Sequence, residues 1–197
     1  MIARRTSLLW VALVLALGAL SGCRQAPLDP GFRVPGPEET QVAMPLRVDF
    51  TVPTGWIEAY NYGTGNDLYP APHATFLIPV GAENDSDNLE VLVVISYLMD
   101  ADVTGQSDAE LISRVKGYAT QVNSAVAEPV KTTVDGMAAF TMPLKEPKRD
   151  GGFYTYDATY ILSGQHLVQI MCQWDKQKTI VDAACASLLQ SVKVVLD

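Results

Sequence analysis

The sequence is poor in basic residues, histidine and cysteine. Lys and Arg together number 14 against 22 Asp and Glu, which gives a net charge of −8, and the chain has two histidines and three cysteines. A shortage of positive charge argues against a nucleic-acid-binding protein, because the phosphate backbone is bound through a basic footprint. The same acidity argues against electrostatic attachment to anionic lipid.

Signatures of common enzymes are missing as well. Neither histidine, His73 or His166, has a nucleophile elbow, a Cys nucleophile or a His-Glu pair beside it. No Gly-rich phosphate loop and no Cys/His cluster with zinc spacing occurs. We therefore expect no cofactor, no metal and no enzymatic activity. A hydrolase is retained as an alternative, provided that the fold brings His166 together with Asp157 or Asp175.

Long hydrophobic runs are also missing. The apolar segment 8–20 is too short for a membrane-spanning helix, which needs about 20 residues. It follows Arg4 and Arg5 and ends in Ser-Gly-Cys at 21–23, so basic, apolar and small-residue zones follow one another as in a secretory signal. We expect residues 1–22 to be a signal peptide that is removed.

The stretch Leu20-Ser21-Gly22-Cys23 resembles the bacterial lipobox. In that motif the chain is cut before the cysteine, which is acylated on its thiol and on its new N-terminus. The resemblance implies that Cys23 is lipidated and that acyl chains hold the protein at a membrane, with about 0.8 kcal/mol for each buried methylene. The expected location is the cell envelope, facing the periplasm or the extracellular side. The alternative is an ordinary secreted protein with a chance cysteine at its cut site.

A tether and one folded domain are predicted after the cut site. Residues 23–43 contain four prolines and few large apolar residues, which is typical of a semi-extended spacer of about 3 Å per residue. Residues 44–197 are long enough to fold as one domain with a sizeable core.

The pattern of residues within 44–197 predicts eight strands and two helices. The strands are expected at 46–52, 56–61, 74–80, 89–98, 125–134, 137–144, 153–163 and 166–174. The run 89–98 is apolar at both parities, which is typical of a central strand covered on both faces. Ser107 and Glu110 form a capping-box pattern at the start of a helix over 107–122.

The end of the domain is predicted to be a helix over about 177–190. Its inward stripe is expected to hold Ile180, Val181, Ala184, Cys185, Leu188 and Val192. Tight hairpin turns are expected at Asp135-Gly136 and at Gly164-Gln165.

Two cysteines fall within this domain, Cys172 and Cys185. An export signal implies an oxidising compartment, so the pair predicts a disulfide. Cys172 shares a face of its strand with Val168 and Ile170 by period two, and Cys185 lies on the apolar stripe of the last helix. The two sulfurs meet if that face covers that helix. A redox or metal pair is the alternative, but the spacing of thirteen is not Cys-x-x-Cys and no histidine is near.

The acidic segment 100–110 resembles the front of an EF-hand calcium loop, with Asp100 and Asp102 at alternate positions. Its final Glu110 stands at position eleven instead of twelve, and a strand precedes it. We therefore interpret the segment as a strand-to-helix loop whose acidic residues favour the helix N-terminus. The acidic run 82–88 is interpreted as a solvated turn.

Aromatic residues gather around the predicted loop 62–73. Trp56 is interpreted as a core residue, whereas Tyr60, Tyr62, Tyr69 and His73 are the favoured surface for a ligand or a partner.

The order of elements resembles the PsbP-like family. The resemblance rests on "FTVPTGW" at 50–56, the long strand 89–98, the helix 107–122 and "VDGMAAF" at 134–140, and it covers about residues 45–197. The resemblance implies an α+β sandwich, an antiparallel sheet with helices on both faces. Within this family, the chain is similar to mycobacterial Lpq-type lipoproteins of unknown function.

The resemblance implies a non-catalytic binding or accessory module with an envelope protein as partner, and the sequence leaves the oligomeric state open. A carrier of a lipid or small hydrophobic ligand is the alternative, for which we expect a deep apolar pocket.

Overall fold

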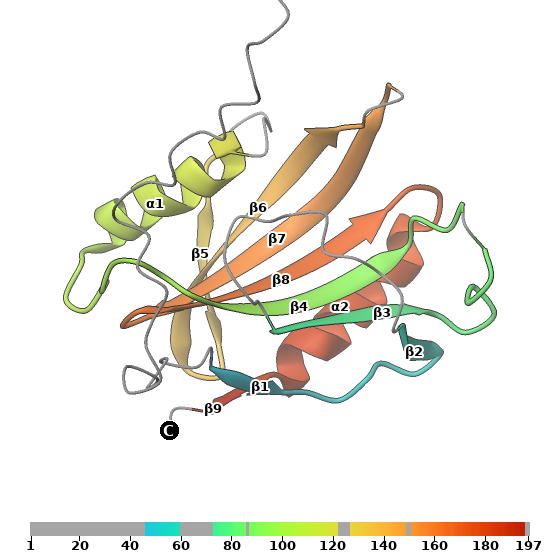
Figure 1. Ribbon diagram of the computed structural model, residues 1–197, viewed down its shortest axis with the longest axis horizontal. Coiled ribbons are helices and arrows are strands. Elements are labelled where there is room, and N and C mark those ends of the chain that lie inside the picture. Colours follow the sequence, from blue (N-terminus) through green and yellow to red (C-terminus); the bar gives the residue numbers. More distant parts are fainter. Residues whose placement is uncertain (1–45, 60–72, 86, 122–126, 149–150, 196–197) are drawn as a thin grey trace, which may run out of the picture. The chain divides into compact units, whose positions relative to one another are not determined.

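The computed structural model of the protein describes residues 46–59, 73–85, 87–121, 127–148 and 151–195. Its main element is a seven-stranded sheet in the order β2-β3-β4-β8-β7-β6-β5, in which all neighbouring strands are antiparallel (Figure 1). The strands are β2 (Trp56–Ala59), β3 (His73–Pro79), β4 (Val91–Leu98), β5 (Val130–Val134), β6 (Met137–Pro147), β7 (Phe153–Ser163) and β8 (His166–Trp174). A separate antiparallel pair joins β1 (Arg47–Asp49) to β9 (Lys193–Val195).

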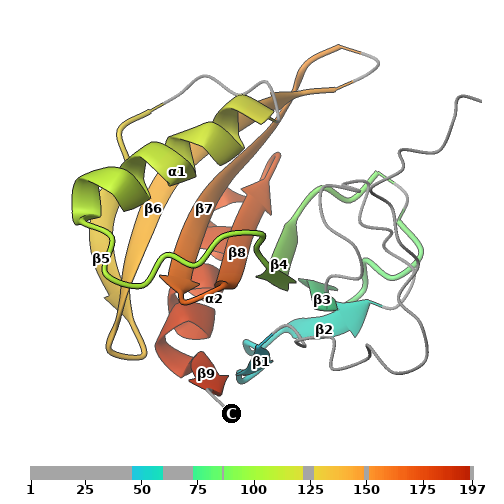
Figure 2. The same cartoon turned by 60° about the vertical axis from the view of Figure 1, so that its left-hand side comes forward.

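The two helices, α1 (Asp108–Gln121) and α2 (Lys178–Ser191), lie on opposite faces of this sheet (Figure 2). Strand β4 contributes side chains to the cores on both faces of the sheet. Val93 packs in the core with α1, and the next residue, Val94, packs in the core with α2. Seven of its eight residues are buried. This confirms the α+β class with helices on both faces and the prediction that 89–98 is a doubly covered strand.

Local signals placed the α1 start and the β5–β6 turn correctly. The backbone N–H of Ser107 donates to the Glu110 carboxylate at 2.7 Å, and the N–H of Glu110 donates back to Ser107 Oγ at 3.4 Å, which is the capping box. Asp135 and Gly136 have φ values of 50° and 76°, and Val134 lies opposite Met137. Two consecutive positive φ values are those of a type I′ hairpin, so this turn is also confirmed.

The predictions were wrong in places at both ends of the domain. The strand expected at 46–52 is only Arg47–Asp49, and it pairs with β9, a strand that was not predicted. The α2 helix ends at Ser191, where Val192 donates its N–H to the carbonyl of Leu188, and the chain then enters β9. Such short strands have no periodicity to detect and exist because they pair with each other.

Ile180 is 53 % exposed, so its inward assignment was also wrong. The buried side of α2 is centred on Val181, Ala184 and Leu188, and a residue one step before Val181 is turned by about 100° away from them. Trp56, which was interpreted as a core residue, is buried in the core between the sheet and α2, which confirms that interpretation.

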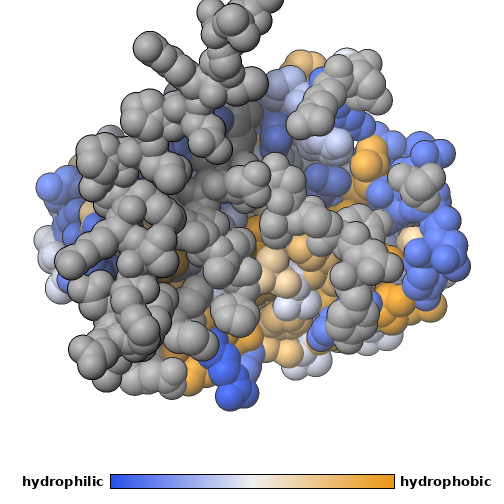
Figure 3. Space-filling model, viewed as in Figure 1, coloured by the Kyte–Doolittle hydropathy of each residue, from blue (hydrophilic) through white to orange (hydrophobic). Residues whose placement is uncertain are grey.

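The acidic turn between β3 and β4 lies in the hydrophilic region at the right of Figure 3. Glu83, Asp85 and Asp87 are all exposed there, which agrees with a solvated turn. Within the described residues, no helix is long and apolar enough to cross a membrane.

Candidate functional site

The predicted surface residues lie largely outside the described part of the chain. Cys23, Tyr60, Tyr62 and Tyr69 all fall there, as do the predicted signal peptide and tether. For His73, the structure describes only the backbone, which begins β3 opposite Ser96. Lipidation of Cys23 and the aromatic surface therefore stay predictions.

The acid–histidine pairs of the hydrolase alternative are not brought together. His166 begins β8 opposite Ser163, whereas Asp157 lies opposite Cys172, six residues further along β7. At about 3.3 Å per residue this separates the two positions by about 20 Å. Asp175 follows β8 at its other end and is further away still.

The acidic loop before α1 is held by its own hydrogen bonds. The Asp102 carboxylate accepts the backbone N–H of Thr104 at 2.7 Å, and Lys131 forms an ion pair with Asp108 at 2.6 Å. Hydrogen bonds from Thr104 lower the pKa of Asp102. Across the described ranges, no three His, Cys, Asp or Glu side chains are grouped so as to hold a metal ion.

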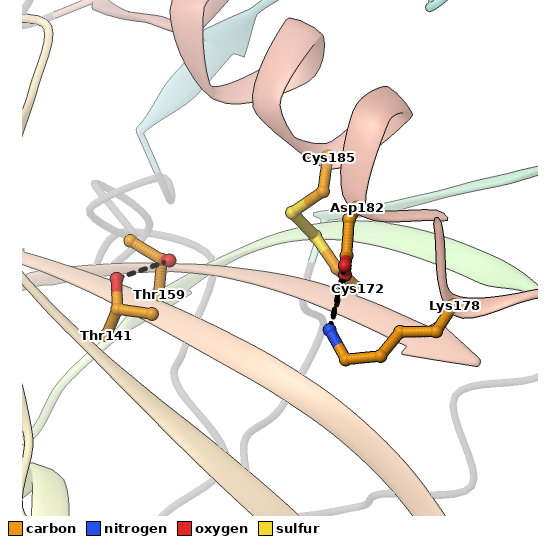
Figure 4. The surroundings of a disulfide bond; sticks show 6 residues. All are labelled: Thr141, Thr159, Cys172, Lys178, Asp182 and Cys185. Atoms are coloured by element: carbon orange, nitrogen blue, oxygen red, sulfur yellow. Dashed lines mark hydrogen bonds and ion pairs between the residues drawn. A yellow bond between two sulfur atoms is a disulfide. The ribbon is translucent and has the colours of Figure 1, made fainter. Parts of the chain in front are cut away.

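The two domain cysteines form a disulfide that joins β8 to α2 (Figure 4). Their Cα atoms are 5.9 Å apart. Cys172 is 3 % exposed and packs with Val168 and Ile170 against the helix, as period two predicted. The predicted bridge is confirmed, and it fixes α2 on this face of the sheet.

Four residues near the disulfide form what we call the charged cluster: Asp157, Trp174, Lys178 and Asp182. Lys178 Nζ contacts both carboxylate oxygens of Asp182 at 2.7 and 2.9 Å, and it also lies 4.3 Å from the centre of the Trp174 ring. Cation–π contact and ion pairing together hold the ammonium group against the sheet.

Asp157 is the unusual member of the charged cluster. It is half-buried on β7, directly opposite Cys172, and no described residue donates a hydrogen bond to its carboxyl group. Burial raises the pKa of Asp157, the charge of Lys178 lowers it, and the charge of Asp182 raises it again. The result is a carboxyl group with free acceptor positions in a partly dehydrated place, which favours a ligand that brings its own donor.

A second feature of this face is the hairpin cavity, a hollow of about 290 Å³ between the β5–β6 hairpin and the C-terminal end of α2. Its lining residues are Thr132, Thr133, Val134, Asp135, Thr141, Leu189, Gln190, Val192 and Lys193. Asp135 closes one side by accepting from Lys193 Nζ at 2.7 Å and from the N–H of Val194 at 3.1 Å. Thr141 links the cavity toward the charged cluster through its 2.8 Å hydrogen bond with Thr159 (Figure 4).

The lining of the hairpin cavity differs from the deep apolar pocket expected of a hydrophobic carrier, because six of its nine residues are polar. From the sequence, Asp157 was expected to matter only as a partner of His166, and the pair Lys178 and Asp182 was not predicted. Two signals were available: Lys and Asp at i and i+4 on a helix, and polar residues at 155, 157 and 159 on one face of an otherwise apolar strand.

Searches of family models and of curated proteins find no match to this chain. Among solved structures, it is similar to the crystal structure of LpqN, involved in cell envelope biogenesis of Mycobacterium tuberculosis, with a TM-score of 0.51 and 12% sequence identity. The similarity covers 77% of this chain and 84% of LpqN, and it shows that the two share a fold.

Two further structures are similar at lower scores. The solution structure of cyanobacterial PsbP (CyanoP) from Synechocystis sp. PCC 6803 has a TM-score of 0.48 and 14% identity, over 79% of this chain and 96% of CyanoP. A crystal structure from Bacteroides thetaiotaomicron VPI-5482 has a TM-score of 0.46 and 10% identity, over 76% of this chain and 46% of the other.

Proposed function

We propose that this protein is a lipid-anchored protein of the cell envelope whose folded domain binds a partner protein and catalyses no reaction. The observation that carries the proposal is a stretch ending at Cys23 that resembles a lipobox, upstream of a domain with a disulfide between Cys172 and Cys185. Structural disulfides persist in oxidising compartments outside the cytoplasm, which is where a lipobox would send the chain. The fold shared with LpqN, itself involved in cell envelope biogenesis, supports the same compartment.

The partner surface that we propose is the charged cluster. Asp157 offers unused acceptor positions beside the exposed Lys178–Asp182 pair, and Trp174 provides apolar area next to them. Tryptophan beside a partly dehydrated charge is typical of the few residues that dominate binding energy at protein interfaces. A partner that places an Arg or Lys side chain against Asp157 would relieve the unfavourable burial of its charge.

The anchor is tested by the mass of the intact protein isolated from membranes of the organism that makes it. We expect the mass of residues 23–197 plus acyl groups, and an increase of about 2 Da on reduction of the disulfide. A Cys23→Ser variant should lose the acyl mass and leave the membrane fraction. A bare mass for residues 1–197 would contradict the lipoprotein assignment without bearing on the charged cluster.

The binding surface is tested separately by photocrosslinking in the intact envelope. A photoreactive residue is placed at position 155, which lies opposite Trp174 in the charged region, or at position 187 on the exposed side of α2 as the control. We expect a crosslinked partner from position 155 only. Equal yields from both positions would contradict a specific surface.

The substitution Asp157→Asn tests whether the charge of Asp157 contributes to binding of the partner. Loss of a charge-assisted hydrogen bond costs about 1.5 kcal/mol, so we expect roughly tenfold weaker binding. Asp175→Asn removes an exposed acid nearby and should leave binding unchanged. Unchanged binding by Asp157→Asn would remove the charged cluster from the interface.

A further inference from the structure

The seven-stranded sheet ends at β5, whose outer edge has no strand beside it in the described part of the chain (Figure 1). Four of its five residues are exposed. An exposed edge presents free N–H and C=O groups and is a ready template for another strand.

The type I′ turn determines which groups of β5 point outward. Val134 and Met137 close the turn as a hydrogen-bonded pair, and pairing then alternates along the hairpin. Val130, Thr132 and Val134 therefore direct their backbone groups toward β6. Lys131 and Thr133 direct both their N–H and their C=O away from the sheet.

The side chains of β5 point alternately to the two faces of the sheet. Val130, Thr132 and Val134 lie on the α2 face, because they are opposite Thr141, Ala139 and Met137 in the register. Val130 is 67% exposed, one of the most exposed large apolar side chains of the described residues. At the other end of the strand, Val134 is 4% exposed and lines the hairpin cavity with Thr132 and Leu189.

We propose that a second copy of this chain pairs with β5, antiparallel and about a twofold axis at Thr132, so that the two sheets become continuous. In this register Lys131 of each copy lies opposite Thr133 of the other, and these residues exchange four backbone hydrogen bonds. Val130 of each copy lies opposite Val134 of the other, at the mouth of the hairpin cavity. Val130 of each copy is thereby placed next to the apolar part of the cavity lining, which includes Val134 and Leu189, and both copies use the same surface, as a twofold interface requires.

Charge argues against one neighbouring register, and proline content argues against one other occupant. Pairing centred on Lys131 would place two lysines directly opposite each other, which is unfavourable, whereas the register at Thr132 does not. The chain's own segment 24–43 is a poor competitor, because its four prolines lack the N–H that strand pairing uses. A five-residue edge and a net charge of −8 on each copy make the association weak and stronger at high salt.

The test is disulfide trapping in the full chain, in intact cells of the organism that makes it, with one cysteine added at a time. The proposed register places Thr132 opposite its own copy in a non-hydrogen-bonded pair, with Cα atoms about 4.5 Å apart, within the range that a disulfide bridges. The two Thr133 residues of the dimer are offset from each other by two positions, about 7–8 Å apart, so Thr133 is the matched control. We expect a covalent dimer from Thr132→Cys on mild oxidation and little from Thr133→Cys.

A second variant distinguishes strand pairing from a disulfide formed by chance encounters between two chains. Thr133→Pro removes an N–H that points away from the sheet, so β5 keeps its bonds to β6 while strand addition is blocked. Added to Thr132→Cys, it should abolish the dimer, and thermal unfolding should show that the domain stays folded. Equal trapping with and without Thr133→Pro, or from both cysteine positions, would overturn the proposal. A crosslink from Thr132→Cys to a different protein would overturn it in favour of a partner strand. None of these outcomes depends on lipidation or on the charged cluster.

Discussion

Replacing Glu90 should expose how α2 is held at its start. The side chain of Glu90 is 6% exposed, and its Oε1 atom accepts the backbone N–H of Lys176 at 2.8 Å, of Gln177 at 3.1 Å and of Asp175 at 3.4 Å. The helix has no cap of its own, because Gln177 makes no side-chain cap bond and the first turn carries no acidic residue. Glu90, just before β4, therefore holds the segment 175–177 that leads into α2, a helix that begins almost ninety residues later.

The magnitude follows from the two shorter bonds. A hydrogen bond to a charged group contributes about 1.5–3 kcal/mol, and bonds that share one acceptor atom are not additive. We expect Glu90→Ala to lower the free energy of unfolding by about 3 kcal/mol. Glu90→Gln keeps an oxygen acceptor and loses the charge, so its cost should be about 1–2 kcal/mol.

The pH dependence has a definite sign. Burial raises the pKa of Glu90, but the three backbone N–H groups outweigh it and hold the pKa below its ordinary value. The stabilisation is therefore complete above the unfolded-state pKa and disappears as the pH falls through the lower folded-state pKa. The gap between the native chain and Glu90→Gln should be full at neutral pH and smaller at an acidic pH below the ordinary pKa of a glutamate.

Denaturant unfolding of both Glu90 variants at the two pH values measures this. Glu83→Gln, an exposed acid in the preceding turn, serves as the control and should change little. A loss below about 0.5 kcal/mol for Glu90→Ala at neutral pH, or a Glu90→Gln gap independent of pH, would refute the role of Glu90 in holding the start of α2.

Three other expectations concern stability. Reducing the Cys172–Cys185 disulfide should cost about 3 kcal/mol, from the closure entropy of a loop with separation 13, and an unchanged denaturation midpoint would contradict this. Asp157→Asn should raise the free energy of unfolding at neutral pH, because burial raises the pKa of Asp157 and its ionisation opposes folding. The gain should vanish at low pH, where the carboxyl group is protonated. A loss of stability at neutral pH would contradict this reasoning. Gly136→Ala should cost about 1 kcal/mol at φ 76°, seen as a lower melting temperature, and a neutral result would contradict the turn assignment.

Much of this fold is predictable because its signals are local. Asp135-Gly136 predicts a tight hairpin whatever surrounds it, and Ser107 with Glu110 predicts a helix start through contacts within one turn. The disulfide followed from two periodicities, which placed Cys172 and Cys185 on the inner sides of neighbouring elements. The candidate site was less predictable, since the residues favoured from the sequence are not those of the charged cluster.

By itself, then, the sequence determined the order of the strands of the main sheet and of the two helices, the tight turn at Asp135-Gly136 and most of the buried positions, because side-chain periodicity and turn chemistry act between near neighbours. Only the tertiary structure decided that β1 pairs with β9, that Glu90 holds the segment leading into α2, that Asp157 lies near Lys178, and that β5 is the last strand of the sheet among the described residues. These contacts join residues far apart in the chain. Their free energy comes from packing whole elements together, and no short segment contains enough of it to reveal the partner.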